Sequence, residues 1–207
     1  MKNIPYSLSP YMPGYRLNEY LLVLSPHEDL RNRIGRIKKD FQEKFQASFT
    51  LSGRPHITLA RFVTWNMGEE KLLHRLQHIA MGVAPFKVEL RDFGSFPSHT
   101  IYINVTTKQP VQQLVKELKT AQKLMKAHKD FEPHFIQEPH LTIARKLLPW
   151  QFEKAWIEYE GLQFTGRFIA DGILFLKRPL GANPYQILSR LEFKNMPVAT
   201  RQGELFA

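Results

Sequence analysis

Two stretches of the chain are nearly identical: residues 55–61 read PHITLAR, and residues 139–145 read PHLTIAR. Five of the seven positions carry the same residue in both copies, and the other two exchange Ile and Leu in opposite order. The two histidines, His56 and His140, are 84 residues apart. A repeat at this separation indicates two related halves of the chain rather than one tight turn.

Each copy has the composition of a β-strand that begins after a proline. Successive side chains of a strand point to opposite faces, so a histidine and the threonine two residues later share one face. His56 therefore accompanies Thr58, and His140 accompanies Thr142, while the aliphatic residues of each copy anchor the other face. If a pseudo-twofold axis relates the halves, the two His and Thr pairs face each other across a groove.

Strand and helix patterns surround the two copies in a similar order. Strands are expected within 20–24, 49–63, 86–93, 101–105, 140–147, 166–177 and 185–193. Helices are expected to begin near residues 25, 66, 110 and 149. This order predicts an α+β protein of two similar lobes, each a mostly antiparallel sheet with helices on the outside. We expect one bilobal domain over 1–207, with an irregular arm at 1–19 and a loose tail at 195–207.

The first expected helix has a clear start and a clear apolar stripe. Its start, SPHE at 25–28, has the pattern of a capping box with proline at the first helical position. The stripe recurs at steps of three and four residues, through Leu30, Ile34, Ile37, Phe41 and Phe45. We expect the helix to end near residue 46 and Lys38, Lys39 and Lys44 to lie on its solvent face.

Composition restricts the class of protein. The chain has 207 residues, 43% of them hydrophobic, which suffices for a substantial core. It has no cysteine, so disulfides and thiolate metal sites are excluded. No stretch resembles a secretory signal or a membrane span, and we expect a soluble, cytoplasmic protein without membrane partners.

The charge balance points to an anionic partner. Lys and Arg outnumber Asp and Glu by 29 to 19, which gives a net charge of +10. Such an excess favours polyanions, with RNA or nucleotides the first candidates. The helix after Pro110 has a basic face of Lys116, Lys119, Lys123 and Lys126. We interpret that face as solvated surface; a track for a nucleic-acid backbone is the alternative.

Two opposed imidazoles suit a displacement at phosphorus. A neutral imidazole can take a proton from the attacking oxygen, and a protonated one can give a proton to the leaving oxygen. Threonine hydroxyls can donate hydrogen bonds to phosphate oxygens as charge builds up. This chemistry requires no metal or cofactor, and His-x-Thr is not a metal-ligand spacing. A single strand histidine is commonly structural, but two copies with five shared residues are harder to explain in that way.

The paired His-x-Thr elements, one in each half, resemble those of the two-histidine phosphoesterase superfamily, and within it the LigT-like, 2′,5′-RNA ligase-like group. The resemblance runs from about Tyr20 to Phe193. It implies a bilobal fold whose histidines face each other in a central cleft. We expect the protein to be a monomer. It also implies activity on RNA-type phosphodiesters, typically opening 2′,3′-cyclic phosphates to 2′-phosphates, or acting on 2′,5′ linkages. By this resemblance His56 and His140 act as acid and base, and Thr58 and Thr142 contact phosphate.

The resemblance also draws attention to the arginine that ends each copy. Some relatives have an arginine near the phosphate three residues after the second threonine, which is Arg145 here, and Arg61 is its counterpart. In a regular strand each arginine would point away from its histidine, so a bulge or the strand's end would have to turn it inward. An arginine that covers the sheet edge is the alternative for both.

Other residues are weaker candidates for the site. His99, in an aromatic turn, is interpreted as a surface residue, with a place at the cleft border as the alternative. Phe62 and Tyr15 are candidates to stack on a base, but we favour core or edge packing as the interpretation of each. Three further histidines, His74, His78 and His128, are expected in helices and are interpreted as ordinary surface or boundary residues.

We therefore expect a metal-independent phosphodiesterase acting on cyclic or 2′,5′-linked nucleotide or RNA substrates. The alternative is a non-catalytic RNA- or nucleotide-binding protein that uses the same basic cleft. A third possibility, a repeat that is only structural, predicts histidines far apart or in separate cores.

Overall fold

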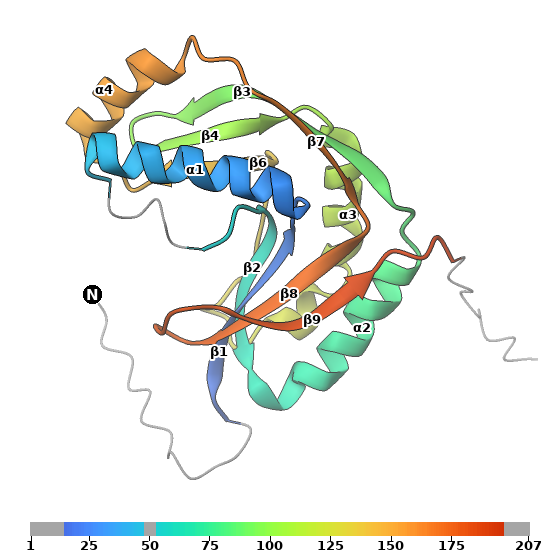
Figure 1. The fold of residues 1–207 in the computed structure, drawn as a ribbon. Coiled ribbons are helices and arrows are strands. Elements are labelled where there is room, and N and C mark those ends of the chain that lie inside the picture. The colour runs from blue at the N-terminus through green and yellow to red at the C-terminus, as the bar shows by residue number, and fades with distance from the viewer. Residues whose placement is uncertain (1–14, 48–52, 197–207) are drawn as a thin grey trace, which may run out of the picture.

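Single α-helices separate groups of one to three strands along the part of the chain that the computed structural model describes, residues 15–47 and 53–196 (Figure 1). The α-helices are α1 (Glu28–Phe45), α2 (Glu69–Met81), α3 (Lys108–Lys119) and α4 (Pro149–Tyr159). The strands are β1 (Leu17–Leu24), β2 (Ile57–Trp65), β3 (Phe86–Phe96), β4 (Thr100–Val105), β5 (His134–Phe135), β6 (His140–Arg145), β7 (Thr165–Ala170), β8 (Gly172–Pro179) and β9 (Gln186–Glu192). The expected α+β class is confirmed.

The strands form one antiparallel sheet in the order β7-β3-β4-β6-β2-β1-β8-β9, with the short β5 beside β2. The sheet has two four-stranded halves, and the two motif strands, β6 and β2, meet at its centre. One registered pair, Ile57 with Leu141, joins the halves. The expectation of two separate sheets is therefore corrected: the halves are similar, but hydrogen bonding links them into a single sheet.

Two helices pack against the half of the sheet to which they do not connect. Helix α1 leads from β1 to β2 yet contacts β6, β7 and α4, and α3 leads from β4 to β6 yet contacts β2 and α2 (Figure 1). Each crossover brings residues of one half against the other half. The chain between the strands thus ties the halves together, in addition to the central strand pair.

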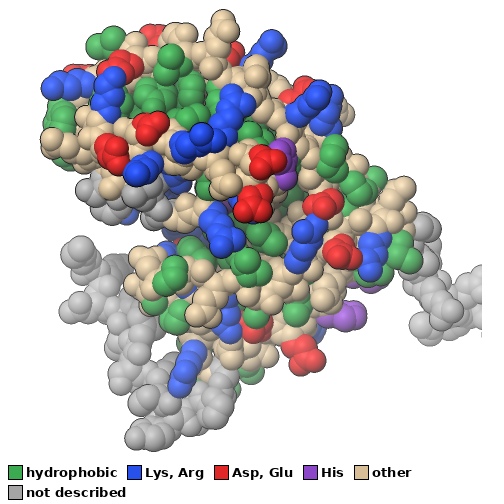
Figure 2. All heavy atoms as spheres, in the orientation of Figure 1, with side chains coloured by type: hydrophobic (Ala, Val, Ile, Leu, Met, Phe, Trp, Pro, Cys, Tyr) green, Lys and Arg blue, Asp and Glu red, His purple; other side chains and the backbone are tan. Residues whose placement is uncertain are grey.

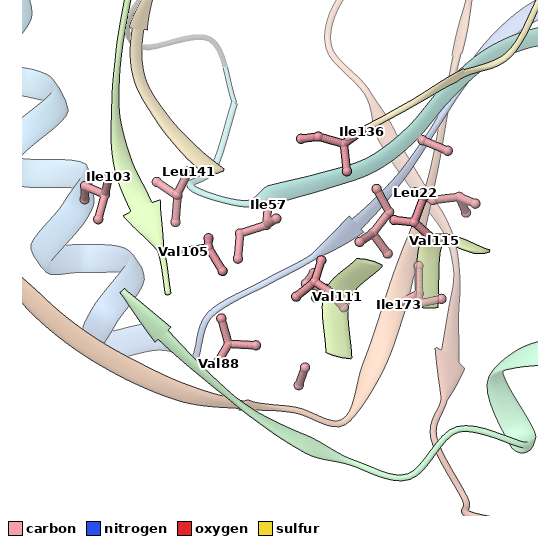
Figure 3. Packing of buried hydrophobic residues seen from close by; sticks show 14 of the residues in the cluster. Leu22, Ile57, Val88, Ile103, Val105, Val111, Val115, Ile136, Leu141 and Ile173 are labelled. Atoms are coloured by element: carbon pink, nitrogen blue, oxygen red, sulfur yellow. The ribbon is translucent and has the colours of Figure 1, made fainter. Parts of the chain in front are cut away.

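The motif strands are held down by their aliphatic side chains. Ile57 and Leu141 are fully buried and lie beside Ile103 and Val105 of β4 in the hydrophobic core (Figure 3). Burying a side chain of this size contributes on the order of 2 kcal/mol. The buried face therefore fixes which side of each motif strand is left for His and Thr.

The start of α1 differs from the expected capping box. His27 is the N-cap residue and makes no side-chain cap, and the helix begins at Glu28. The Ser25 hydroxyl instead accepts a hydrogen bond from Arg31. The Arg31 guanidinium donates to Ser25 Oγ at 3.3 Å and to the Pro26 carbonyl oxygen at 2.9 Å. The end of the helix agrees with expectation, with Gln46 in the left-handed conformation as C-cap.

The prediction that three lysines lie on the solvent face of α1 is wrong for one of them. Lys39 and Lys44 are exposed, but Lys38 is only 7% exposed. Its place in the helix explains this, because it follows Ile34 by four residues and precedes Phe41 by three, and both of those side chains are buried. Lys38 therefore lies in the apolar stripe itself.

The expected strand at 166–177 is two strands, β7 and β8, separated at Asp171. Strand β7 pairs with β3 at one edge of the sheet, whereas β8 pairs with β1 in the other half. The chain must therefore leave one half and enter the other at this point. A Cβ on Gly172 would lie 2.7 Å from the Leu191 carbonyl oxygen, so glycine permits the close approach of β8 to β9.

The expected terminal segments overlap the described chain only in part. Strand β1 begins at Leu17, inside the expected arm at 1–19, and residues 1–14 and 197–207 lie outside the described part. Within 15–47 and 53–196, no helix is long and apolar enough to cross a membrane.

Candidate functional site

The two copies of the motif lie side by side at the centre of the sheet. Because Ile57 pairs with Leu141 on the buried face, the residues on either side of them point to the opposite face. Extending the same antiparallel register places His56 across from Thr142, and Thr58 across from His140. The repeat therefore does not lead into two separate cores: all four side chains gather on one face at the junction of the halves.

The two imidazoles are oriented by equivalent hydrogen bonds. His56 Nδ1 lies 2.7 Å from the Arg54 carbonyl oxygen, and His140 Nδ1 lies 2.8 Å from the Glu138 carbonyl oxygen. A carbonyl oxygen only accepts, so Nδ1 of each ring carries the proton and donates it. In the neutral rings Nε2 is then the basic nitrogen, and no described residue hydrogen-bonds to it in either ring.

A β-bulge occurs at the same position of both copies. The register of β2 against β1 shifts between Thr58 and Ala60, and that of β6 against β4 shifts between Thr142 and Ala144. Each extra residue reverses the alternation of faces for the residues that follow it. Burial follows this reversal, because in both strands two consecutive buried residues precede an exposed arginine. Arg61 and Arg145 therefore project to the face of the histidines.

The two arginines have different surroundings. Arg61 Nε lies 3.3 Å from Glu19 Oε1, so this guanidinium is paired with a carboxylate. Arg145 lies close enough to Lys38 and His56 for its charge to lower the pKa of both groups. Because β2 and β6 run antiparallel, the end of the second motif lies beside the beginning of the first.

The electrostatic environment also differs between the two histidines. Burial lowers the pKa of both rings, and the hydrogen bond to the backbone carbonyl opposes this shift in each. The positive charges of Lys38 and Arg145 lower the pKa of His56 further. The carboxylate of Glu138 instead acts to raise the pKa of His140. The His56 end of the site is therefore the more electropositive one.

Aromatic rings surround His140. The Phe96 and Tyr102 ring centroids lie 4.9 Å and 5.0 Å from that of His140, and 4.6 Å from each other. Tyr102 is opposite Thr142 in the ladder between β4 and β6, which places it on the same face as the motif side chains. One end of the site is thus cationic and the other aromatic.

The weaker candidates from the sequence are either exposed at the surface or packed in the hydrophobic core. His99, His74, His78 and His128 are exposed, as expected. Phe62 is buried and stacks with Tyr20 at 5.3 Å, which is a core role. Tyr15 is exposed and its ring meets the Trp65 ring edge-on at 6.2 Å.

The basic face after Pro110 is exposed at Lys116, Lys119 and Lys123. On the face of the molecule that Figure 2 shows, Lys and Arg side chains lie among Asp and Glu side chains rather than in one continuous stripe. Within 15–47 and 53–196, no group of three or more His, Cys, Asp or Glu side chains is placed to hold a metal ion.

Three residues of the site were not recognised from the sequence: Lys38, Phe96 and Tyr102. The spacing of Lys38 from Ile34 and Phe41 was a usable signal, because it fits the helical stripe. Tyr102 lies between Ile101 and Ile103, so strand alternation alone separates it from the core face. Phe96 had no comparable signal, since β3 extends three residues beyond its expected end.

The motif, the strand order and the paired histidines define a class of protein. The chain belongs to the 2′-5′ RNA ligase superfamily, whose model matches residues 26–182. Its fold is similar to that of LigT from E. coli in complex with 3′-AMP, with a TM-score of 0.60 at 16% identity, over 86% of this chain and 98% of that one. LigT complexed with NADP+ matches with a TM-score of 0.52 at 17% identity, over 88% and 99% of the chains.

A structure described as a phosphoesterase also matches, with a TM-score of 0.52 at 16% identity, over 87% of this chain and 99% of that one. No curated protein sequence matches the chain. The family and the LigT-like fold agree with the resemblance that the doubled motif indicated.

Proposed function

We propose that the protein is a phosphodiesterase that opens 2′,3′-cyclic phosphates, or cleaves 2′,5′ linkages, of RNA or nucleotide substrates. The observation that carries the proposal is the pairing of β2 with β6, which gathers His56, Thr58, His140 and Thr142 on one face. The hydrogen bonds from Nδ1 fix both rings in the same tautomer and leave Nε2 of each ring without a partner among the described residues.

In the proposed hydrolysis, water attacks phosphorus and the bond from phosphorus to the 3′ oxygen breaks. One imidazole takes a proton from the attacking water at Nε2, and the other gives its Nε2 proton to the departing 3′ oxygen. The products are a 2′-phosphate and a free 3′ hydroxyl. The reaction needs no metal, because the two rings supply both proton transfers.

The environments favour different roles for the two rings. His56, beside two cations, is held more strongly in the neutral form that a base requires, and His140, beside Glu138, retains a proton more readily. We therefore assign His56 as base and His140 as acid in the hydrolytic direction. The roles exchange in the reverse, ligating direction.

The threonines and arginines would stabilise the phosphoryl group. Thr58 and Thr142 are half-buried, and their hydroxyls have no hydrogen-bond partner among the described residues, so they are available to phosphate oxygens. Arg145 lies near His56 and supplies charge where negative charge develops. Arg61 shares the face but is paired with Glu19, so we give it the smaller part.

Two alanine variants test the proposal. His56→Ala and His140→Ala should each lower turnover of 2′,3′-cyclic AMP by about 100- to 10,000-fold, the usual contribution of a general acid or base. His99→Ala, at an exposed histidine outside the motifs, is the matched control and should turn over at the wild-type rate. A chelator should not change the wild-type rate.

Undiminished turnover in either motif variant would contradict the mechanism, as would complete inhibition by the chelator. The net charge of +10 favours one other function, a nucleotide- or RNA-binding protein without catalysis. That function predicts binding of 2′,3′-cyclic AMP, 2′,5′-linked oligoadenylate and RNA ends with no turnover of any of them.

A further inference from the structure

A lysine is buried in the apolar stripe of α1. Lys38 is 7% exposed and lies between the fully buried Ile34 and Phe41. Removing an ammonium group from water is costly unless another group compensates for the lost hydration. A buried lysine in an otherwise apolar stripe therefore calls for a physical reason.

No carboxylate of the described chain compensates the charge of Lys38. Its one hydrogen bond there is a long one, 3.5 Å from Nζ to the Gly53 carbonyl oxygen. The neighbouring lysines of the same helix are paired: Lys39 with Glu43 at 3.7 Å and Lys44 with Glu158 at 2.5 Å. Lys38 differs from them in both burial and partners.

The charged neighbours of Lys38 are groups of the candidate site. Burial first, and then the positive charge of Arg145, lower the pKa of Lys38 to about 8. The ammonium is therefore still largely protonated at neutral pH. Its charge in turn acts on the imidazole of His56. The geometry agrees, because Lys38 Nζ donates to the carbonyl of Gly53, and the carbonyl of the next residue, Arg54, accepts the hydrogen bond from His56 Nδ1. Helix α1 also packs against β6, which carries Arg145. The positive charges of Lys38 and Arg145 therefore act on each other and on the neutral ring of His56.

A bound anion would offset this repulsion. We propose that Lys38, together with Arg145, binds the phosphoryl oxygens of the substrate beside His56. The inference rests on the proposed function only in identifying the anion as the scissile phosphate. Lys38 and Arg145 supply two positive charges beside the phosphoryl group, where negative charge builds up beyond that of the diester as the water attacks phosphorus.

Binding of inorganic phosphate, measured by calorimetry at pH 7, tests the inference without requiring turnover. Lys38→Met keeps the volume and removes the charge, and Lys39→Met is the control one residue away on the exposed face. We expect Lys38→Met to weaken phosphate binding by about 10- to 100-fold, the usual effect of losing a charged hydrogen bond. Lys39→Met should stay within about twofold of the wild type.

Phosphate affinity of Lys38→Met equal to that of the wild type would overturn the inference, and so would a wild type that binds no phosphate. The imidazole resonances give a second readout that a purely structural role would not move. Lys38→Met should raise the pKa of His56 and leave that of His140 in place.

If Lys38→Met does not fold, the wild type alone decides the matter. Saturating phosphate should raise the pKa of the Lys38 ammonium, followed by NMR, because a bound anion favours the charged form. An unchanged pKa would refute the inference.

Failure of this inference and failure of the proposed function give different results. If the protein turns over cyclic phosphates but Lys38→Met does not change phosphate affinity, the role of Lys38 is refuted and the proposed activity stands. If Lys38→Met weakens phosphate binding but the wild type turns over no substrate, the role of Lys38 stands and the proposed activity is refuted.

Discussion

His56 and His140 make the same hydrogen bond from Nδ1 to the carbonyl two residues before them, and yet their surroundings differ. Lys38 and Arg145 stand beside the first ring, and the carboxylate of Glu138 stands near the second. Sequence identity of the two copies would make the rings equivalent. Lys38 and Glu138, which lie outside the motif, act with Arg145 to make them unequal, and this inequality is the basis of the base and acid roles that we propose.

The pH dependence of kcat/KM follows from these shifts. Burial lowers the pKa of both histidines below 6.5, so the bell-shaped profile for 2′,3′-cyclic AMP should have its maximum on the acid side of pH 6.5. Activity should rise with pH as the base loses its proton and fall as the acid loses its own. Lys38→Met removes one cause of the lowered pKa of His56, so the rising limb should move to higher pH.

Lys39→Met is again the control and should leave both limbs in place. A shift of the falling limb instead would exchange the roles assigned to the two rings. A maximum well above pH 6.5 in the wild type would contradict the lowered pKa values as the source of the profile.

At the scale of elements, the bulges in β2 and β6 decide which side chains join the site. Without the extra residue in each strand, the arginines would point to the aliphatic face, where a buried unpaired guanidinium would be costly. The bulges bring both arginines to the histidine face. Residues of the neighbouring strands then give the two arginines different partners. Glu19 of β1 holds Arg61, whereas no ion pair within the described residues includes Arg145.

Substitution of the two arginines should therefore have unequal effects. We expect Arg145→Met to lower kcat/KM by about 10- to 100-fold, because a charged contact to phosphate is lost. Arg61→Met should lower it by less than about threefold. Glu19 keeps its hydrogen bonds to Arg178 at 2.8 Å and 2.5 Å, so this variant should retain its fold. Equal losses in the two variants would show that Arg61 also reaches the phosphate.

At the scale of the whole molecule, one sheet and one core extend through both halves. The strand pair at Ile57 and Leu141 joins the sheet, and α1 and α3 each cross to the opposite half. A single cluster of buried residues includes side chains from all four helices. We therefore propose that the chain is one bilobal domain, whose halves are stable only together.

Equilibrium unfolding in urea tests this proposal with the three tryptophans of the chain. Trp65 reports on the half with β2, and Trp156 of α4 reports on the other half. Variants that keep only one of them, with phenylalanine at the other two positions, should unfold with coincident midpoints by fluorescence and by circular dichroism. Independent lobes would instead give different fluorescence midpoints for the two variants. The helical signal in circular dichroism would then be lost in two steps.

The sequence by itself determined the α+β class, the repeated architecture and the family that the doubled motif resembles. Local spacing suffices for this: His-x-Thr fixes a shared face through strand alternation, and the stripe of α1 fixes its buried side. The same rules failed where other contacts override the pattern. The Arg31 side chain takes the Ser25 hydroxyl that was expected to cap α1, and pairing with strands in different halves separates β7 from β8.

Only the tertiary structure decided how the two copies meet and how they differ. The register of β2 against β6 joins residues 84 positions apart, and no local pattern encodes that pairing. The bulges depend on the strands that flank each motif, so the direction of Arg61 and Arg145 could not follow from alternation. The charge of Lys38 beside His56 depends on the packing of α1 against β6. The electrostatic fields that make the two nearly identical motifs unequal act through space, not along the chain.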